Sequence, residues 1–203
     1  YSGGLSGTSS LIGNTGSADN TYHYSDDGTN LAQIAAGDLR YIAIGSGTIL
    51  NTLNSGGNDF ASAISPNGRI IWAQQSTAMW YSFDPDTPGT SVILSTGAAT
   101  DVGFPVITDR LAVWTETELV NPPWAFAGSL YVQEIDEATG VLLDLHLMSS
   151  NVDLHSGFAG TSQTFRDTAV DKLVTWRDKN GDIHLANFGC SNCDEFLDDI
   201  IDE

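Results

Sequence analysis

The stretch ISPNGRIIWAQQSTAMWYSFDPDTPG, residues 64–89, decides the fold class. It contains two short runs of β-branched and aromatic residues, IIWA (70–73) and AMWYSF (78–83), and turn-forming residues precede the first and follow the second. Short strand-forming runs set between clusters of Gly, Pro, Asn, Asp and Ser are typical of antiparallel β-structure. Helical signals are scarce in the whole chain, so we interpret this stretch as a small antiparallel meander.

Four stretches of the chain share the start of this unit. Each has a turn-like polar segment, a basic residue and then a run of strand formers: GDLRYIAIGS (37–46), PNGRIIWAQQ (66–75), TDRLAVWTET (108–117) and VDKLVTWRDK (170–179). The corresponding basic residues are Arg40, Arg69, Arg110 and Lys172. In three of the four stretches a tryptophan follows, at Trp72, Trp114 and Trp176. This recurrence predicts an internal repeat in which these tryptophans pack between neighbouring sheets.

A second strand pattern follows three of these starts and leads into or out of an acidic turn. Its copies are AMWYSFDPDTPGTSVIL (78–94), SLYVQEIDEATGVLLDLHLM (129–148) and DIHLANF (182–188). The chain therefore predicts an all-β, propeller-like array of about four antiparallel meander units, with a β-sandwich as the alternative. We expect a Gly- and Ser-rich N-terminal segment (1–19), a β-repeat domain (20–189) and a cysteine-containing acidic tail (190–203).

The stretch 64–89 resembles a blade of the TolB-like β-propellers, in which a turn with Asp or Asn before Gly is followed by a strand and a Y-x-x-D strand. VITDRLAVWTETE with SLYVQEIDEATG is similar to the same blade in secreted propeller repeats, and TYHYSDDGTNLAQI (21–34) resembles the third and fourth strands of a blade. The resemblance covers most of residues 20–188. Because this family normally has more than four blades, it implies a compact four-bladed disc, a segment of a larger propeller, or repeats closed by another chain.

The charge of the chain excludes some classes of partner. Seven Lys and Arg against 26 Asp and Glu give a net charge of −19. Such a surface repels phosphate backbones and anionic membranes, so we expect no nucleic-acid partner. The apolar runs are much shorter than the roughly 20 residues that span a bilayer, so we expect no membrane span. The acidity fits either solubility in salty or extracellular water or a surface that collects divalent cations.

The first residue and the two cysteines bear on where the protein is located. The chain opens at Tyr1 without a basic-then-apolar leader, which we interpret as a processed mature chain or an excised segment. Cys190 and Cys193 are interpreted as a small-loop disulfide of an exported protein, with free thiols as the alternative. A four-cysteine zinc site within the chain is excluded because there is no second cysteine pair. The predicted localisation is secreted, extracellular or on the cell surface.

The stretch LVTWRDKNGDIHLANF (173–188) has two interpretations. Asp178, Asn180 and Asp182 alternate as the first ligands of a calcium loop do, but the glycine stands at position 4 rather than 6, and position 12 is Gly189 rather than Glu. The Asn-Gly dipeptide suits a type I′ turn between two strand-forming runs. We expect a hairpin, with a calcium ion at these three residues as the alternative and no other cofactor.

The sequence contains none of the common catalytic motifs. It has no G-x-S-x-G, phosphate-binding loop or dinucleotide fingerprint, and its four histidines are scattered. Asp144 and His146 alternate on a predicted strand, where a solvent-side histidine is the ordinary interpretation and an acid–base group is the alternative.

Two segments are candidate contact elements. The first is a proline-rich apolar insertion, VNPPWAFAG (120–128), with the candidate residues Pro122, Pro123, Trp124 and Phe126. Local packing is the alternative for this insertion. The second is the tail DEFLDDIIDE (194–203), which carries six acids and one apolar stripe at helical spacing, formed by Phe196, Leu197, Ile200 and Ile201. We expect the tail to dock on its own domain or on a neighbouring subunit.

Together these features predict an exported, non-catalytic binding or assembly protein on a β-propeller-like scaffold. Its partner is expected to be another protein or a second copy of the chain. One alternative is a subunit of an extracellular filament or surface layer with a β-sandwich fold. The other alternative is a propeller-type hydrolase or lyase whose catalytic residues lie in loops without a recognisable motif.

Overall fold

The fold is built from strands and the turns that join them. The computed structural model describes residues 22–24, 29–35, 37–44, 46, 48–53, 59–74, 78–97, 101–117, 127–153, 169–170 and 172–188. Within these residues all regular secondary structure is β-strand. The predicted all-β class is therefore confirmed.

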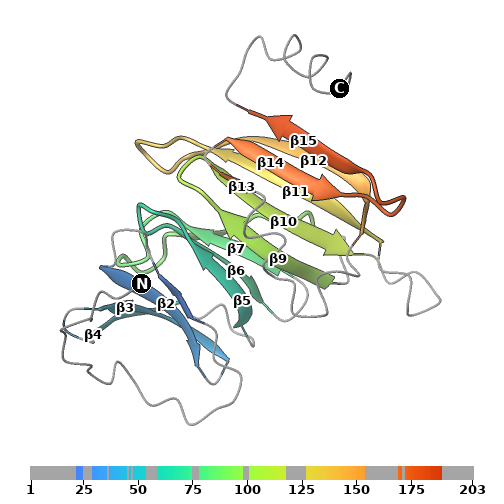
Figure 1. Cartoon of the computed structure of the whole chain (residues 1–203). Helices are drawn as coiled ribbons and strands as arrows, with labels where there is room; N and C mark the ends of the chain where they lie inside the picture. The colour runs from blue at the N-terminus through green and yellow to red at the C-terminus, as the bar shows by residue number, and fades with distance from the viewer. Residues whose placement is uncertain are drawn as a thin grey trace, which may run out of the picture.

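The strands form four sheets that follow one another along the chain (Figure 1). The first sheet consists of β1 (Tyr22–Tyr24), β2 (Asn30–Ala35), β3 (Asp38–Ala43) and β4 (Thr48–Leu53). The second consists of β5 (Asp59–Ile64), β6 (Ile70–Gln74), β7 (Ala78–Ser82) and β8 (Ser91–Ile93). The third consists of β9 (Asp101–Ile107), β10 (Leu111–Thr117), β11 (Ala127–Ile135) and β12 (Leu142–Asp153). The fourth consists of β13 (Ala169–Val170), β14 (Leu173–Arg177) and β15 (Ile183–Asn187).

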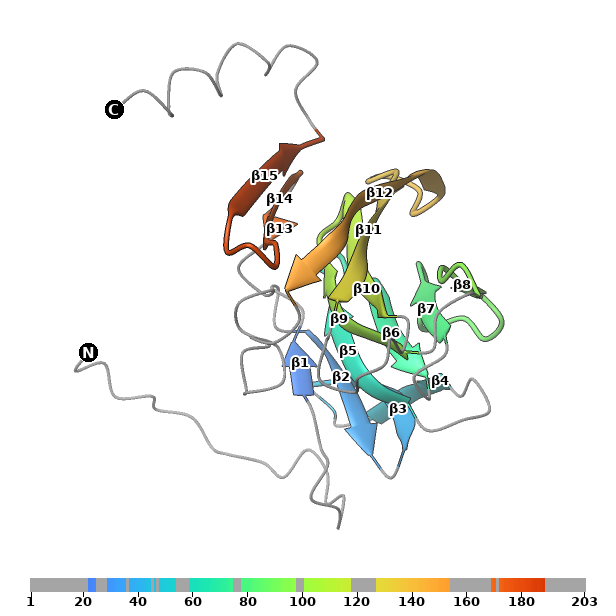
Figure 2. The same cartoon turned by 90° about the vertical axis from the view of Figure 1, so that its right-hand side faces the viewer.

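Every sheet is an antiparallel meander, because each strand pairs with the strand next to it in the sequence. Figures 1 and 2 show the four sheets in a row, in chain order from the first sheet in blue to the fourth in orange and red. This arrangement is propeller-like, with four successive sheets instead of the two facing sheets of a sandwich. Within the described residues the row does not close into a ring.

Three apolar clusters join each sheet to the next. The first cluster places Ile70 and Trp72 of β6 against the first sheet, including Leu39 and Tyr41. The second joins the second and third sheets around Trp114. The third joins the third and fourth sheets, where Val174 and Trp176 pack against valine and leucine side chains of the third sheet. Burial of these side chains is the main force that holds the sheets together.

The three repeat tryptophans occupy the same place in successive sheets. Each lies on the second strand, packs toward the preceding sheet and stacks on the aromatic residue directly opposite on the third strand. The ring pairs are Trp72 with Trp80 at 6.1 Å, Trp114 with Tyr131 at 5.6 Å, and Trp176 with His184 at 5.1 Å between centroids. Their interplanar angles are 15°, 17° and 13°, so each pair is stacked. Such cross-strand aromatic pairs stabilise a sheet.

The repeat of basic residues differs from the prediction in the first sheet. Arg69, Arg110 and Lys172 each stand directly before the second strand of their sheet. Arg40 instead lies inside the third strand, β3, opposite Gln33 of β2. The turn before Arg40 joins the second and third strands of its sheet, whereas the turns before the other three residues join the first and second strands. The local sequences of these turns are similar, which is why the prediction placed them together. Arg40 therefore does not correspond to the other three residues.

The same shift corrects the N-terminal strands. The segment 21–34 was expected to form the third and fourth strands of a blade, but it contains β1 and β2, the first two strands of the first sheet. The local pattern of two strands around an acidic glycine turn is the same in both places, so only the pairing with β3 and β4 distinguishes them.

No helix among the described residues is long and apolar enough to cross a membrane.

Candidate interaction surfaces

A row of exposed leucines runs along β12, the outermost strand of the third sheet. Leu143, Leu145 and Leu147 expose 54%, 46% and 57% of their surface, while Asp144 and His146 alternate with them. We call Leu143, Leu145 and Leu147 the β12 leucine row. Three large apolar side chains on one face of an edge strand are unusual, because such edges invite association.

Backbone contacts fix the direction in which this row points. Gln133 of β11 is buried, and its side-chain amide donates to the carbonyl oxygens of Leu143 at 2.9 Å and Asp144 at 3.2 Å. The strand pairing has a bulge beside it, between Gln133 and Ile135. A bulge turns the strand and redirects its side chains. The buried amide thus holds the start of β12 in place.

The opposite face of β12 packs on the molecule. His146 lies beside Phe188 with ring centroids 5.2 Å apart, and its Nε2 is 2.8 Å from Oε1 of Glu134. Met148 packs on the cluster between the third and fourth sheets. Asp144 is exposed. The partner of His146 is therefore Glu134 on the neighbouring strand, and the alternating Asp144 contributes no contact to this pair.

A buried arginine joins the second and third sheets at the turn that precedes β12. The Arg69 guanidinium donates from Nη1 to the carbonyl oxygen of Asp109 at 2.6 Å and from Nη2 to that of Glu137 at 2.5 Å. Asn67 donates its backbone N–H to Oδ1 of Asp109 at 2.9 Å. Arg110 forms an exposed ion pair with the Glu137 carboxylate, 2.5 Å from Nη2. Three turns from two sheets thus meet at Arg69.

The turn between β11 and β12 is held closely against this arginine. Gly140 has φ 73°, and a Cβ there would lie 2.7 Å from Cβ of Phe83, so only glycine fits. The Tyr81 hydroxyl donates to the carbonyl oxygen of Gly140 at 2.9 Å. Burial raises the pKa of Tyr81 to about 12, and the nearby Arg69 charge lowers it only in part. The hydroxyl therefore remains protonated and able to donate.

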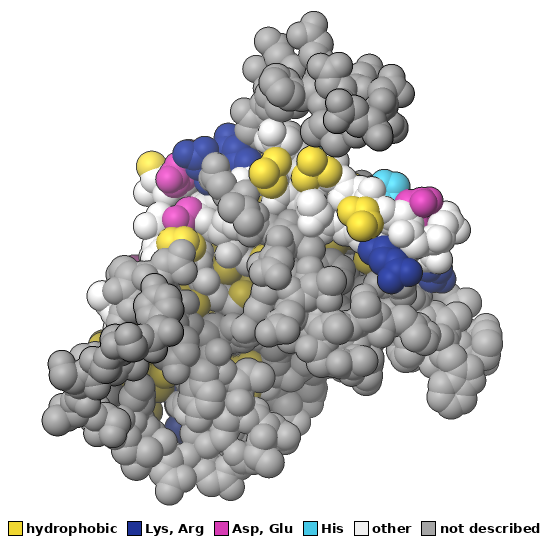
Figure 3. All heavy atoms as spheres, viewed as in Figure 1, with side chains coloured by type: hydrophobic (Ala, Val, Ile, Leu, Met, Phe, Trp, Pro, Cys, Tyr) yellow, Lys and Arg dark blue, Asp and Glu magenta, His cyan; other side chains and the backbone are white. Residues whose placement is uncertain are grey.

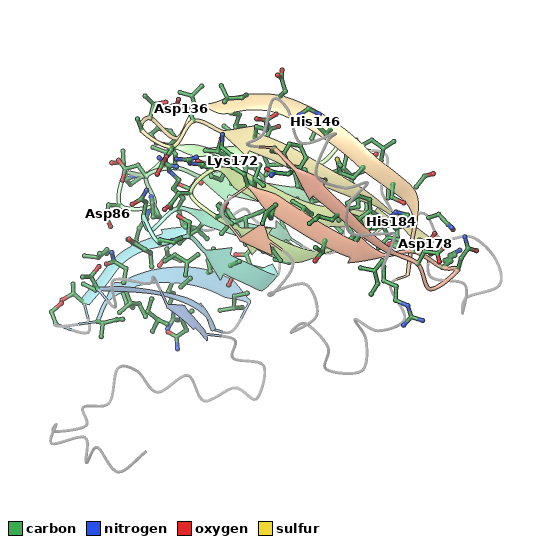
Figure 4. All side chains as sticks on the ribbon, turned by 45° about the horizontal axis from the view of Figure 1, so that its top comes forward. Asp86, Asp136, His146, Lys172, Asp178 and His184 are labelled. Carbon is green, nitrogen blue, oxygen red and sulfur yellow. The ribbon has the colours of Figure 1, made fainter. Side chains whose placement is uncertain are left out.

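Acidic side chains accompany these turns. The hydroxyl and backbone N–H of Thr139 both donate to Asp136, and these bonds lower the pKa of that carboxyl. Partial burial raises the pKa of Asp86, with the Asp84 charge adding to the effect. Figure 4 shows Asp86 and Asp136 on the same side of the sheets, away from Asp178 and His184. Arg69 and Arg110 contact the same turns, so acidic and basic side chains lie together on this side.

The hairpin between β14 and β15 is present, with Trp176 opposite His184. Its loop differs from a two-residue type I′ turn. Asp178 donates its N–H to the carbonyl oxygen of Asp182 at 2.9 Å, which leaves three residues in the loop, and Gly181 has φ 94°. A three-residue loop ending in a left-handed glycine is the next most common hairpin connection.

The Asp178 carboxylate organises this loop. Its Oδ1 accepts the backbone N–H groups of Asn180 at 2.9 Å and Asp182 at 3.0 Å, and its Oδ2 lies 3.4 Å from Nε2 of His184. Partial burial raises the pKa of Asp178, but these hydrogen bonds and the His184 charge outweigh it, so the net shift is downward. In Figure 4, Asp178 and His184 lie together at one end of the hairpin. Calcium binding at Asp178, Asn180 and Asp182 stays a prediction.

The predicted disulfide cysteines and the other predicted contact residues lie outside the described residues. They are Cys190 and Cys193, the apolar insertion residues Pro122, Pro123, Trp124 and Phe126, and the tail residues Phe196, Leu197, Ile200 and Ile201. The predicted segments 1–19 and 190–203 also lie outside the described part of the chain. Among the residues that the structure describes, no group of three or more His, Cys, Asp and Glu side chains could hold a metal ion.

Comparison with known proteins supports the fold. No protein-family model matches the chain, and no curated protein matches it either. The WD40 domain of Neurospora crassa Pan2 is similar in structure, with a TM-score of 0.51, 11% identity, and coverage of 82% of this chain and 48% of that one. The chain has a β-propeller-like fold, whose four sheets do not close into a ring within the described residues.

Two other similar structures have lower scores. BamB from Moraxella catarrhalis has a TM-score of 0.44 and 12% identity, over 82% of this chain and 45% of that one. The TolB structure from Agrobacterium tumefaciens has a TM-score of 0.42 and 16% identity, over 63% of this chain and 50% of that one. The chain thus spans about half the length of each of these three structures.

Proposed function

We propose that this protein is an exported, non-catalytic scaffold of propeller type that binds another protein through the β12 leucine row. The observation that carries the proposal is the exposure of Leu143, Leu145 and Leu147 on an edge strand. A bound protein would cover these side chains and gain the free energy of burying them, up to roughly 1.5–3 kcal/mol for each leucine. An extended segment of that protein would also pair with the outer edge of β12 beside these leucines.

The charge of the chain indicates what kind of protein would bind. The net charge is −19, the exposed Asp144 alternates with these leucines along β12, and Asp136 and Glu137 lie in the turn before the strand. A second copy would bring the same acidic surface and would be repelled. The partner is therefore a protein segment that combines apolar residues with Lys or Arg. Electrostatic attraction would speed its association.

Site-specific photo-crosslinking in the producing cells tests this proposal. A photoreactive residue at position 145 or 147 should crosslink to one protein, whereas the same residue at the exposed turn position Thr87 should not. With that protein purified, Leu145→Asp should weaken binding by about tenfold or more, and Thr87→Asp should leave it unchanged.

Three outcomes would reject the proposal or part of it. Crosslinks that form equally at position 87 would show that the leucine row is not the contact surface. Sedimentation of the pure chain as a long polymer would favour the filament alternative. Recovery of the protein in the cytoplasm alone would reject the exported location while leaving the contact surface intact.

A further inference from the structure

The fourth sheet presents an uncovered face that corresponds to a covered face in the third sheet. Strand pairing places Leu173, Leu185 and Ile183 on one side of β14 and β15, away from Val174 and Trp176. Ile183 exposes 81% of its surface, and the two leucines are also exposed. Figure 3 shows hydrophobic side chains over β14 and β15 with Lys and Arg side chains beside them. We call Leu173, Ile183 and Leu185 the β14–β15 outer face.

The internal repeat shows that this position in a sheet is normally buried. Leu111 follows Arg110 as Leu173 follows Lys172, and the residues paired alike on β11 and β15 are Val132 with Leu185 and Leu130 with Ile183. Leu111, Leu130 and Val132 are at most 1% exposed, because the fourth sheet covers them. The β14–β15 outer face therefore continues an established series of interfaces by one more step.

The surroundings of this face call for an acidic occupant. Lys172 precedes β14, Arg177 ends it on the same side as Ile183, and Lys179 lies in the hairpin loop. These are three of only seven basic residues in a chain that carries 26 acids. In Figure 4, Lys172 lies toward the end of the hairpin that is opposite to Asp178. An anionic segment placed across the face would meet basic side chains at both ends.

One segment of this chain has the required chemistry and position. Residues 189–203 begin directly after Phe188, the last residue described, so the segment starts beside β15. Its last ten residues, DEFLDDIIDE, combine six acids with four apolar side chains at helical spacing. Ten residues of helix span roughly 15 Å, close to the length of about 17 Å expected for a five-residue strand. The segment thus has a length and an apolar stripe that fit the face, and its charge is opposite to that of the basic residues beside the face.

We propose that residues 194–203 cover the β14–β15 outer face as a short amphipathic helix. Phe196, Leu197, Ile200 and Ile201 then pack on Leu173, Ile183 and Leu185, and the acids of the helix lie beside Lys172, Arg177 and Lys179. Acids near a helix C-terminus oppose the helix dipole, so this helix does not form in isolation. Contact with the basic residues offsets that repulsion and couples folding of the tail to docking.

Hydrogen exchange of the full-length protein measures the docking. Amides of residues 194–203 should exchange at least about tenfold more slowly in the protein than in a free peptide of residues 189–203, as local opening of a docked segment requires. Ile200→Asp in the tail and Leu185→Asp on the face should each abolish this protection. Leu145→Asp, which changes the β12 leucine row, is the matched control and should leave it intact.

Two of the measurements separate loss of docking from general loss of structure. Ile200→Asp alters only the tail, so the amides of β6 and β10 should keep their protection while those of β15 exchange faster. Arg177→Glu preserves the apolar contacts, and it should reduce tail protection at low salt more than in about 1 M salt, where charges are screened.

The competing occupants give different results. Tail amides that exchange as fast as the free peptide, in a monomeric protein, would overturn the proposal. A dimer that dissociates on Leu185→Asp while the tail stays unprotected would assign the face to a second copy and would also overturn it. Neither result would bear on the β12 leucine row, whose test uses different residues.

Discussion

At the scale of single residues, Arg69 is the side chain on which the joint between the second and third sheets depends. It is buried, and its guanidinium satisfies two carbonyl oxygens that belong to turns of the third sheet. Arg110 stands at the same place one sheet later, but its partner Glu137 is half exposed. The two arginines look alike in the sequence but differ in burial and in their partners.

Replacement of Arg69 should therefore destabilise the protein much more than replacement of Arg110. Arg69→Met leaves two carbonyl oxygens without donors and should lower the free energy of unfolding by about 2–3 kcal/mol. Arg110→Gln removes a solvent-screened ion pair and should cost about 1 kcal/mol or less. Urea unfolding followed by tryptophan fluorescence measures both. Equal losses would contradict the role assigned to Arg69.

Asp178 should make stability depend on pH. Its pKa is lower in the folded protein than in the unfolded chain, so its contribution is present above the unfolded pKa of about 4 and is lost as the pH falls through the folded value. The stability difference between wild type and Asp178→Asn should therefore shrink on acidification below about pH 4. Urea midpoints of both proteins across that range measure it, and a difference that stays constant with pH would reject the assignment.

At the scale of elements, each repeat tryptophan stacks on an aromatic residue of the neighbouring strand and packs against the preceding sheet. Its copies differ in one detail. Nε1 of Trp114 donates to the buried Glu116 carboxylate at 3.0 Å, whereas Nε1 of Trp72 is buried without a hydrogen-bond partner. Glu116 also accepts from the hydroxyl and backbone N–H of Thr96. The repeat tryptophan of the third sheet thus belongs to a polar network, whereas the Nε1 atom of Trp72 in the second sheet does not.

This difference predicts unequal effects for the same substitution. Trp72→Phe removes only ring volume, while Trp114→Phe also removes a donor from a buried carboxylate. Trp114→Phe should lower the free energy of unfolding by about 1 kcal/mol or more beyond the effect of Trp72→Phe. Chemical unfolding of the two variants gives the comparison directly. If Trp72→Phe were the more damaging, the hydrogen bond to Glu116 would not be the stabilising element.

Strand composition predicted most elements, but not their place in a sheet. IIWA and LAVW form β6 and the start of β10 because their residues favour pleated, buried surfaces. Arg40 was misplaced because a basic residue before a strand run also occurs between the second and third strands. The β12 leucines alternate as those of a buried strand do, and their exposure depends on whether another sheet reaches them. Such tertiary information is not local to the sequence.

At the scale of the whole molecule, the net charge of −19 acts on stability as well as on partner choice. Like charges repel more strongly in the compact state than in the expanded one, and salt screens this repulsion. We therefore expect the midpoint of thermal unfolding to rise by several degrees as the salt concentration increases from about 0.01 to 0.5 M.

Calorimetry in sodium chloride and in choline chloride measures this effect. Equal increases in the two salts would identify screening as the cause. An increase with sodium alone would instead indicate a specific cation site, and a decrease in both would show that favourable ion pairs such as Arg110 with Glu137 dominate.

The orientation of the repeat tryptophans implies an order in which the sheets complete their packing during synthesis. Each one seals the sheet that was synthesised before its own, as Trp72 does for the first sheet and Trp176 for the third. During translation, a sheet leaving the ribosome would keep an unsealed side until the second strand of its successor emerges. Each sheet would thus complete its apolar core only after the next sheet has begun to fold against it.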